Sequence, residues 1–145
     1  FCGLGNFTLA LARKCGSIIG IEGAQAMVER ASENAAANGI TNADFYCADL
    51  SRSMSGASWM AKPCNKVLLD PPRSGALEIL PDIVKLQPER IVYVSCNPAT
   101  LARDAGYLSE HGYVMALAGA MDMFPQTAHV EAMVLFLRSD TCEAP

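Results

Sequence analysis

Short runs of β-branched and apolar residues alternate with longer stretches in which apolar residues recur at helical spacing. The short runs predict strands over residues 17–21, 43–47, 66–69, 90–95, 113–118 and 131–137. The longer stretches predict helices over 24–38, 76–86 and 99–110, the first closed by Gly39, and residues 56–63 predict a surface loop. This alternation predicts an α/β fold with a mostly parallel sheet, helices on both faces and a C-terminal antiparallel hairpin.

Polar residues recur where the predicted strands end. Glu22 follows one strand directly, Asp49 lies just after the next, and Asp70 ends the third. Two prolines after Asp70 fix an extended backbone and leave its carboxylate and nearby carbonyl groups available. Because ligands of parallel sheets bind at the carboxyl ends of the strands, this pattern predicts a cofactor crevice, although a rigid loop would explain the prolines equally well.

The glycine pair Gly3 and Gly5 precedes a predicted helix and would let the backbone approach a ligand closely. Glu22 comes 17 residues after Gly5, close to the spacing at which an acidic residue binds ribose hydroxyls. A dinucleotide site would have a third Gly or Ala where this chain has Thr8. The pattern therefore favours S-adenosylmethionine, with Asp49 at the adenine amino group. A dinucleotide-dependent oxidoreductase and a plain glycine turn stay open.

The segment around Cys96 predicts a nucleophile. Asn97 is a favourable N-cap and Pro98 a favourable first helical residue, so Cys96 lies where a strand becomes a helix. Unsatisfied N–H groups and the positive end of the helix dipole favour its thiolate form. Glu131, which enters the last strand, is a candidate general base. It alternates with His129, but one His and one Glu make an improbable metal site, so no metal is predicted.

Composition narrows the classes of protein. The net charge is −4, from 11 basic and 15 acidic residues, and no basic run is longer than 13–14, so a nucleic-acid substrate would need a basic surface elsewhere. The longest apolar runs, such as 132–137, are far shorter than a membrane span, and six cysteines without a CxxC pair indicate a reducing, cytoplasmic compartment. The chain opens at Phe1 within a motif, so we expect a piece of a longer protein whose first strand is truncated.

Four segments resemble the RNA 5-methyluridine (uracil-C5) methyltransferase family: FCGLGNFTLALA, LLDPPRSGA, IVYVSCNPATLARD and MDMFPQTAHVEAMVLF. They follow the family's order and span essentially the whole chain. The likeness is closest to the branch that methylates 23S ribosomal RNA. DPPRSG instead resembles the transfer-RNA branch, because the ribosomal branch often has DPARAG there, so tRNA stays open as the substrate.

The resemblance implies a Rossmann-like class I methyltransferase fold, S-adenosylmethionine as cofactor and RNA as partner, with no membrane and no obligate protein partner. It assigns Cys96 as nucleophile, Glu131 as base, and as cofactor contacts Phe1, Asn6, Glu22, Asp49 and Asp70. Family members also carry an upstream RNA-binding barrel, and many hold an iron–sulfur cluster on upstream cysteines. Residues 1–145 are thus expected to be a catalytic domain; a non-catalytic RNA-binding module stays an alternative.

Overall fold

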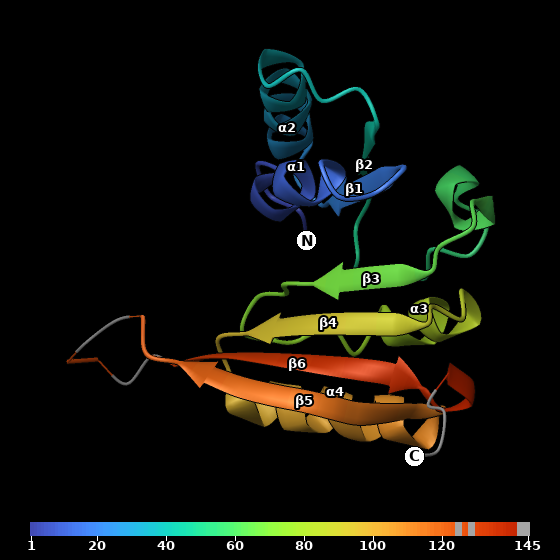
Figure 1. Ribbon diagram of the computed structural model, residues 1–145, viewed down its shortest axis with the longest axis vertical. Coiled ribbons are helices and arrows are strands. Elements are labelled where there is room, and N and C mark those ends of the chain that lie inside the picture. The colour runs from blue at the N-terminus through green and yellow to red at the C-terminus, as the bar shows by residue number, and fades with distance from the viewer. Residues whose placement is uncertain (124–125, 128–129, 142–145) are drawn as a thin grey trace. The chain divides into compact units, whose positions relative to one another are not determined.

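A computed structural model describes residues 1–123, 126–127 and 130–141 of the chain. It divides into two compact units, Phe1–Arg52 and Ser53–Pro145, and each unit has its own sheet (Figure 1).

The first unit is built on a pair of parallel strands. Its elements are α1 (Asn6–Ala12), β1 (Ile18–Glu22), α2 (Gln25–Ala37) and β2 (Ala43–Cys47). The strands pair in parallel from Ile18 opposite Ala43 to Glu22 opposite Cys47. The helix α2 connects them and buries its small apolar side chains, which are Val28, Ala31 and Ala35. Two parallel strands cannot be joined by a tight turn and need a crossover connection of about a dozen or more residues, which α2 supplies.

The start of the chain runs beside β1. The amide of Cys2 and the amino group of Phe1 both donate to the carbonyl oxygen of Ile21, at 2.9 and 2.7 Å. The predicted strand that would precede Phe1 lies outside the sequence and stays a prediction.

The second unit contains a mixed sheet of β3 (Lys66–Leu69), β4 (Arg90–Ser95), β5 (Tyr113–Met121) and β6 (Glu131–Arg138). The strands follow the order β3-β4-β6-β5 (Figure 1), in which β3 and β4 are parallel, and β6 runs antiparallel to both β4 and β5. The helices of this unit are α3 (Leu80–Lys85) and α4 (Pro98–Glu110), with 3-10 turns at Ser58–Ala61 and Ser139–Thr141. Its core is fully buried at Leu80, Ile91, Tyr93, Leu108 and Phe136.

Most predicted elements are confirmed. The strands over 43–47, 66–69 and 90–95 match at both ends, the C-terminal hairpin forms, and Gly39 follows α2 with a φ of +65°. The strand predicted to end at residue 118 continues to Met121, with an irregularity between Met115 and Leu117. The predicted loop over 56–63 contains a short 3-10 helix.

The helix predicted over 76–86 is wrong in its first part, because α3 begins only at Leu80. The cause is Pro81, which has no amide hydrogen and whose ring would clash with the carbonyl group four residues earlier in a longer helix. A proline is tolerated in the first turn, so the helix starts one residue before it. Residues 76–79 form turns instead.

Candidate active site

Glu22 is held at the carboxyl end of β1 by main-chain amides. Its carboxylate accepts hydrogen bonds from the amides of Gly3 (3.0 Å), Gly23 (2.8 Å) and Ala24 (3.3 Å). Gly3 has a φ of +52°, and a Cβ placed on it would meet nothing within 4 Å, so the backbone there borders open space. A fixed acceptor beside an accessible main chain is suited to binding hydroxyl groups of a ligand.

The glycine turn brings the other predicted contacts of this unit to the same place. The amide of Gly5 donates to the carbonyl group of Cys2 at 2.9 Å, and Gly5 caps α1 with a φ of +86°. Asn6 is the exposed first residue of α1, and Phe1 is half-buried. The structure therefore gathers Phe1, Gly3, Gly5, Asn6 and Glu22 at one end of the first unit.

Asp49 lies two residues beyond β2. The amide of Ala48, just before it, donates to the carbonyl oxygen of Glu22 at 2.9 Å, which continues the strand pairing toward Asp49. The Asp49 carboxylate accepts from the hydroxyl (2.6 Å) and the amide (3.0 Å) of Ser51 and pairs with Arg52 at 3.2 Å. The Ser51 hydroxyl, more than any other group, lowers the pKa of Asp49 and keeps it ionised.

In the second unit, the turn from β4 into α4 carries Cys96. Asn97 caps the helix, because its side-chain oxygen accepts from the amide of Ala99 at 3.1 Å, as predicted. The buried Ser95 hydroxyl accepts from the amide of Asn97 at 3.1 Å. Half-buried Cys96 thus lies between two residues whose backbone and side chains are fixed.

The antiparallel pairing of β4 with β6 brings the candidate nucleophile and base to one end of the sheet. Ser95 pairs with Ala132 as the last residue pair of this ladder. Cys96 follows Ser95 and Glu131 precedes Ala132, so both lie one step beyond that pair. His129 lies outside the described residues. The sequence placed β6 in a hairpin with β5 but gave no sign that β6 would separate β5 from β4.

Asp70 lies at the same end as Cys96. The parallel ladder of β3 and β4 ends with Leu69 opposite Tyr93, and Asp70 is the next residue. Three predicted residues, Asp70, Cys96 and Glu131, therefore share one end of the four-stranded sheet, while the other six belong to the first unit.

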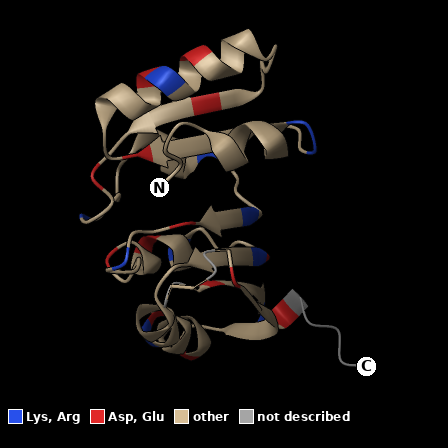
Figure 2. Cartoon of the chain, turned by 90° about the vertical axis from the view of Figure 1, so that its left-hand side faces the viewer, with Lys and Arg blue, Asp and Glu red and all other residues tan. Residues whose placement is uncertain are grey.

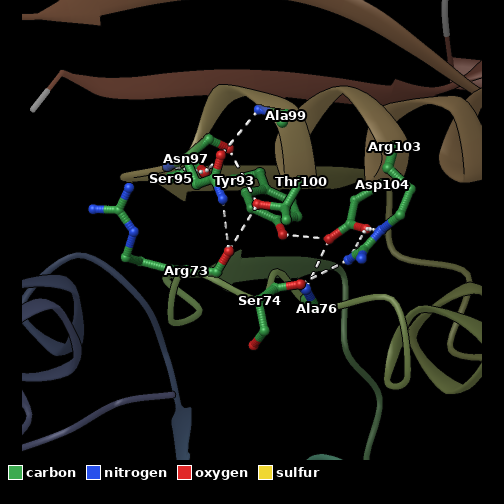
Figure 3. Close-up of polar contacts among 10 residues, drawn as sticks. All are labelled: Arg73, Ser74, Ala76, Tyr93, Ser95, Asn97, Ala99, Thr100, Arg103 and Asp104. Atoms are coloured by element: carbon green, nitrogen blue, oxygen red, sulfur yellow. Dashed lines mark hydrogen bonds and ion pairs between the residues drawn. The ribbon is translucent and has the colours of Figure 1, made fainter. Parts of the chain in front are cut away.

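The sequence interpretation missed a group of polar residues on α4 that bond the loop after Asp70 (Figure 3). The signal was present as polar residues at helical spacing, which are Asn97, Thr100 and Asp104.

Within the described residues, no three His, Cys, Asp or Glu side chains are arranged to hold a metal ion. Among the same residues, no helix has the length and apolar content to cross a bilayer. Five cysteines are free thiols in this part of the chain, and Cys142 lies outside it.

Comparison with known proteins gives close relatives. The chain is 58% identical over 139 residues to the 23S rRNA (uracil(1939)-C(5))-methyltransferase RlmD of Alkalilimnicola ehrlichii, which covers 95% of this chain and 31% of the relative. The protein of the same name from Pseudomonas aeruginosa is 58% identical over 136 residues, covering 94% and 30%. The chain therefore spans about a third of the length of these curated relatives.

Solved structures agree with the fold. The tRNA (uracil-54, C5)-methyltransferase of Pyrococcus abyssi, in complex with S-adenosyl-L-homocysteine, has a TM-score of 0.79 and 33% identity, covering 94% of this chain and 32% of that one. A putative RNA methyltransferase of Pyrococcus horikoshii has a TM-score of 0.74 at 15% identity, covering 98% and 72%. These likenesses confirm the Rossmann-like class I methyltransferase fold.

A family model matches residues of both units, from the glycine turn to the end of β6. Residues 1–139 match the family described as tRNA (Uracil-5-)-methyltransferase. The chain belongs to the tRNA (uracil-5-)-methyltransferase family.

Proposed function

We propose that residues 1–145 form the catalytic domain of an S-adenosylmethionine-dependent enzyme that methylates C5 of a uridine in RNA. The proposal includes a covalent bond between Cys96 and C6 of the uracil. The observation that carries it is the β4–β6 register, which brings Cys96 at the start of α4 and Glu131 to one end of the sheet. Family membership and the names of the relatives support it.

The two residues have complementary tasks. C5 of uracil is a poor nucleophile, and addition of the Cys96 thiolate to C6 turns the ring into an enolate that is nucleophilic at C5. The bound cofactor supplies the methyl group. Glu131 then takes the C5 proton, the electrons of the C5–H bond form the C5–C6 double bond, and the C6–S bond breaks to return the thiolate. The uridine must leave its stack to meet both side chains.

The first unit fits the cofactor in its donor and acceptor chemistry. Glu22 offers a carboxylate for the two ribose hydroxyls, and Asp49 offers one for the adenine amino group. Gly3 borders open space, whereas Thr8, where a dinucleotide site would have Gly or Ala, is buried in α1. S-Adenosylmethionine has no pyrophosphate that would need a small residue there. Asp70 is the contact proposed from the second unit.

Ribosomal RNA is the favoured substrate. The relatives named for 23S rRNA are 58% identical to this chain, whereas the structure named for tRNA is 33% identical. Transfer RNA is the second candidate because DPPRSG resembles the tRNA branch. Action on either RNA would place the protein in the cytoplasm.

Much of the binding to RNA phosphates is proposed to come from outside this chain. The chain is acidic, with a net charge of −4, and along the described residues its Lys and Arg positions are scattered among acidic ones (Figure 2). Binding to phosphates needs concentrated positive charge. A further domain of the parent protein would supply it.

The test uses the full-length parent protein, methyl-labelled S-adenosylmethionine, and unmodified 23S rRNA and tRNA transcripts. We expect label at C5 of a uridine, in 23S rRNA rather than tRNA. RNA with 5-fluorouridine at the target should trap a protein–RNA adduct, because fluorine cannot leave C5 as a proton does. Cys96→Ala should give neither product, whereas the matched control Cys15→Ala, an exposed cysteine of the first unit, should give both.

Two results would overturn the proposal. Binding of NAD but not of S-adenosylmethionine would favour a dinucleotide-dependent oxidoreductase. RNA binding without methyl transfer by the full-length protein would favour a non-catalytic RNA-binding module.

A further inference from the structure

The loop that follows Asp70 runs along the first two turns of α4. Four residues of the N-cap and helix, Asn97, Thr100, Arg103 and Asp104, point toward this loop (Figure 3). Asn97, Thr100 and Asp104 are spaced by three or four residues, which places them on one helical face, and Arg103 is next to Asp104. We call these four residues the α4 clamp.

The α4 clamp bonds the main chain of this loop. The Asn97 amide group donates to the carbonyl oxygen of Arg73 at 2.9 Å. The Thr100 hydroxyl shares its proton between that oxygen, at 3.2 Å, and the carbonyl oxygen of Asn97, at 3.1 Å. Arg103 donates to the carbonyl oxygen of Ser74 at 2.9 Å. The bonds to the loop join residues 24 to 29 positions apart and fix the path of the loop.

Asp104 anchors the clamp from inside the unit. It is 0% exposed and accepts from the amide of Ala76 at 2.7 Å and from the hydroxyl of Tyr93 at 2.5 Å. Arg103 donates to its second oxygen at 2.8 Å. Tyr93 is itself 0% exposed, and its burial and its bond to Asp104 raise its pKa, so the phenol remains a donor. A buried carboxylate with every partner in place is strongly restrained.

Gly75 is the residue at which this loop approaches the α4 clamp closely. Gly75 has a φ of +85°, and a Cβ added to it would lie 2.5 Å from the Arg103 guanidinium and 2.7 Å from the Asp104 carboxylate. The loop therefore approaches the clamp more closely than any side chain at position 75 would allow.

The hydrogen-bonded ladder between β3 and β4 does not include Asp70 or Cys96. It ends at Leu69 opposite Tyr93, while Asp70 and Cys96 lie beyond it. The clamp continues the connection, since it ties the loop leaving β3 to the helix that follows β4.

We propose that the α4 clamp, with Asp104 as its main positioning residue, sets the place of Asp70 relative to Cys96 for methyl transfer. This inference rests on the proposed function. A methyl donor and a nucleophilic carbon must meet in line, and a displacement of about 1 Å from such an arrangement costs roughly 10²-fold in rate. A buried clamp restricts that displacement without touching the reacting atoms.

The sharpest variants stay close to the native side chain in size and change its hydrogen bonds or its charge. In the full-length protein, Thr100→Val removes the hydroxyl and should lower kcat by about three- to tenfold, whereas Thr100→Ser keeps the hydroxyl and should retain most of it. Asp104→Asn should lower kcat about tenfold or more. The KM for RNA should change little in all three, since the phosphates are gripped elsewhere.

A matched control separates positioning from general stability. Asp82 is also a buried aspartate, 2% exposed, and it accepts from the amide of Met54 at 2.6 Å and pairs with Lys85 at 2.8 Å. Asp82→Asn should lower the melting temperature, as Asp104→Asn does, but leave kcat within about twofold. Equal losses of kcat in both variants, or full kcat in Thr100→Val, would overturn the inference.

Hydrogen exchange tests whether the α4 clamp holds the loop, independently of whether the protein transfers a methyl group. The amide of Ala76 should lose protection in Asp104→Asn, and that of Met54 in Asp82→Asn. A wild-type protein that transfers no methyl group contradicts the proposed function, and with it the catalytic role of the clamp. Unchanged protection of Ala76 in Asp104→Asn contradicts the clamp alone.

Discussion

The two units hold their candidate site residues by different means. In the first unit, Glu22 and Asp49 are fixed by groups close to them: Glu22 by three amides of the glycine turn and of the start of α2, and Asp49 by Ser51 two residues away. In the second unit, the loop after Asp70 is fixed by side chains of α4, and Asp104 at their centre is completely buried.

The difference matches what each set of residues has to do. A carboxylate that binds a ligand must keep acceptor capacity open to solvent, so it is oriented by nearby main-chain donors and left partly exposed. Residues that perform covalent chemistry need their relative position fixed more tightly than their exposure. The first unit is thus expected to govern affinity and the second to govern rate.

The largest effect is expected from the candidate base. Glu131→Gln keeps the shape of the side chain and removes its basicity, so the C5 proton cannot leave and the thiolate is not expelled. Turnover should fall by about 10²–10⁴, the usual contribution of a general base. A protein–RNA adduct that already carries the labelled methyl group should accumulate on a denaturing gel.

Comparing Cys96→Ala, Glu131→Gln and the variant that combines them tests whether thiolate addition comes before proton removal. Cys96→Ala should form no adduct, and the double variant should behave like Cys96→Ala, because addition comes before proton removal. Adduct formation by Cys96→Ala would exclude Cys96 as the nucleophile. Near-normal turnover in Glu131→Gln would exclude Glu131 as the base.

Alanine substitutions at Gly75 and Gly3 compare how tightly the two units pack around these glycines. Gly75→Ala adds left-handed strain and a clash with Asp104, and should destabilise the folded protein by about 2–4 kcal/mol. Gly3→Ala also adds strain, at a φ of +52°, but meets open space and should cost only about 1–2 kcal/mol. Denaturant unfolding of both full-length variants measures the difference. Equal losses would mean that the loop does not pack tightly on α4.

The sequence predicted those parts whose signals are local. The strands over 66–69 and 90–95 contain uninterrupted apolar runs, and Asn97-Pro98 is a strong helix start, so these strands and the place of Cys96 followed directly. The strand from Tyr113 was underestimated because its second half, Ala118–Met121, is rich in alanine and glycine and carries little strand preference. The predicted helix over 76–86 contains Pro81, and the structure places this proline in the first turn of α3.

The remaining features depend on partners far along the chain. The position of β6 between β4 and β5 follows from tertiary packing, and no local pattern encodes it. The α4 clamp bonds carbonyl and amide groups of the loop, and main-chain groups leave no trace in residue identity. Only the side-chain half of each bond, such as Thr100 or Asp104, could have been noticed.

The division between affinity and rate predicts a smaller, binding-specific effect in the first unit. Glu22→Ala should weaken S-adenosylmethionine binding by calorimetry at least about tenfold, equivalent to ~1.4 kcal/mol, because the carboxylate proposed to bind the two ribose hydroxyls is lost. At saturating cofactor, kcat should stay near that of the wild type. Glu33→Ala, an exposed residue of α2 paired with Arg30, is the control and should bind normally. Unchanged affinity in Glu22→Ala would remove Glu22 from the site.

The smallest effect concerns acid stability and contrasts a buried aspartate with an exposed one. Burial opposes ionisation of Asp82, but bonds from Lys85, Met54 and Ser53 outweigh it and hold the pKa of Asp82 below its ordinary value.

A carboxyl with a lowered pKa in the folded state stabilises the fold above its unfolded pKa of about 3.9, and this stability is lost as the pH falls through the folded value. Because burial and bonding largely offset each other, Asp82→Asn should lower the melting temperature at pH 7 by roughly 2–4 °C, about 1 kcal/mol. The difference from wild type should shrink as the pH falls below the unfolded pKa of about 3.9 and through the lower folded value. Asp49→Asn, at an exposed site, should change the melting temperature less at every pH. A pH-independent loss in Asp82→Asn would show that packing, and not its charge, stabilises the loop at Met54.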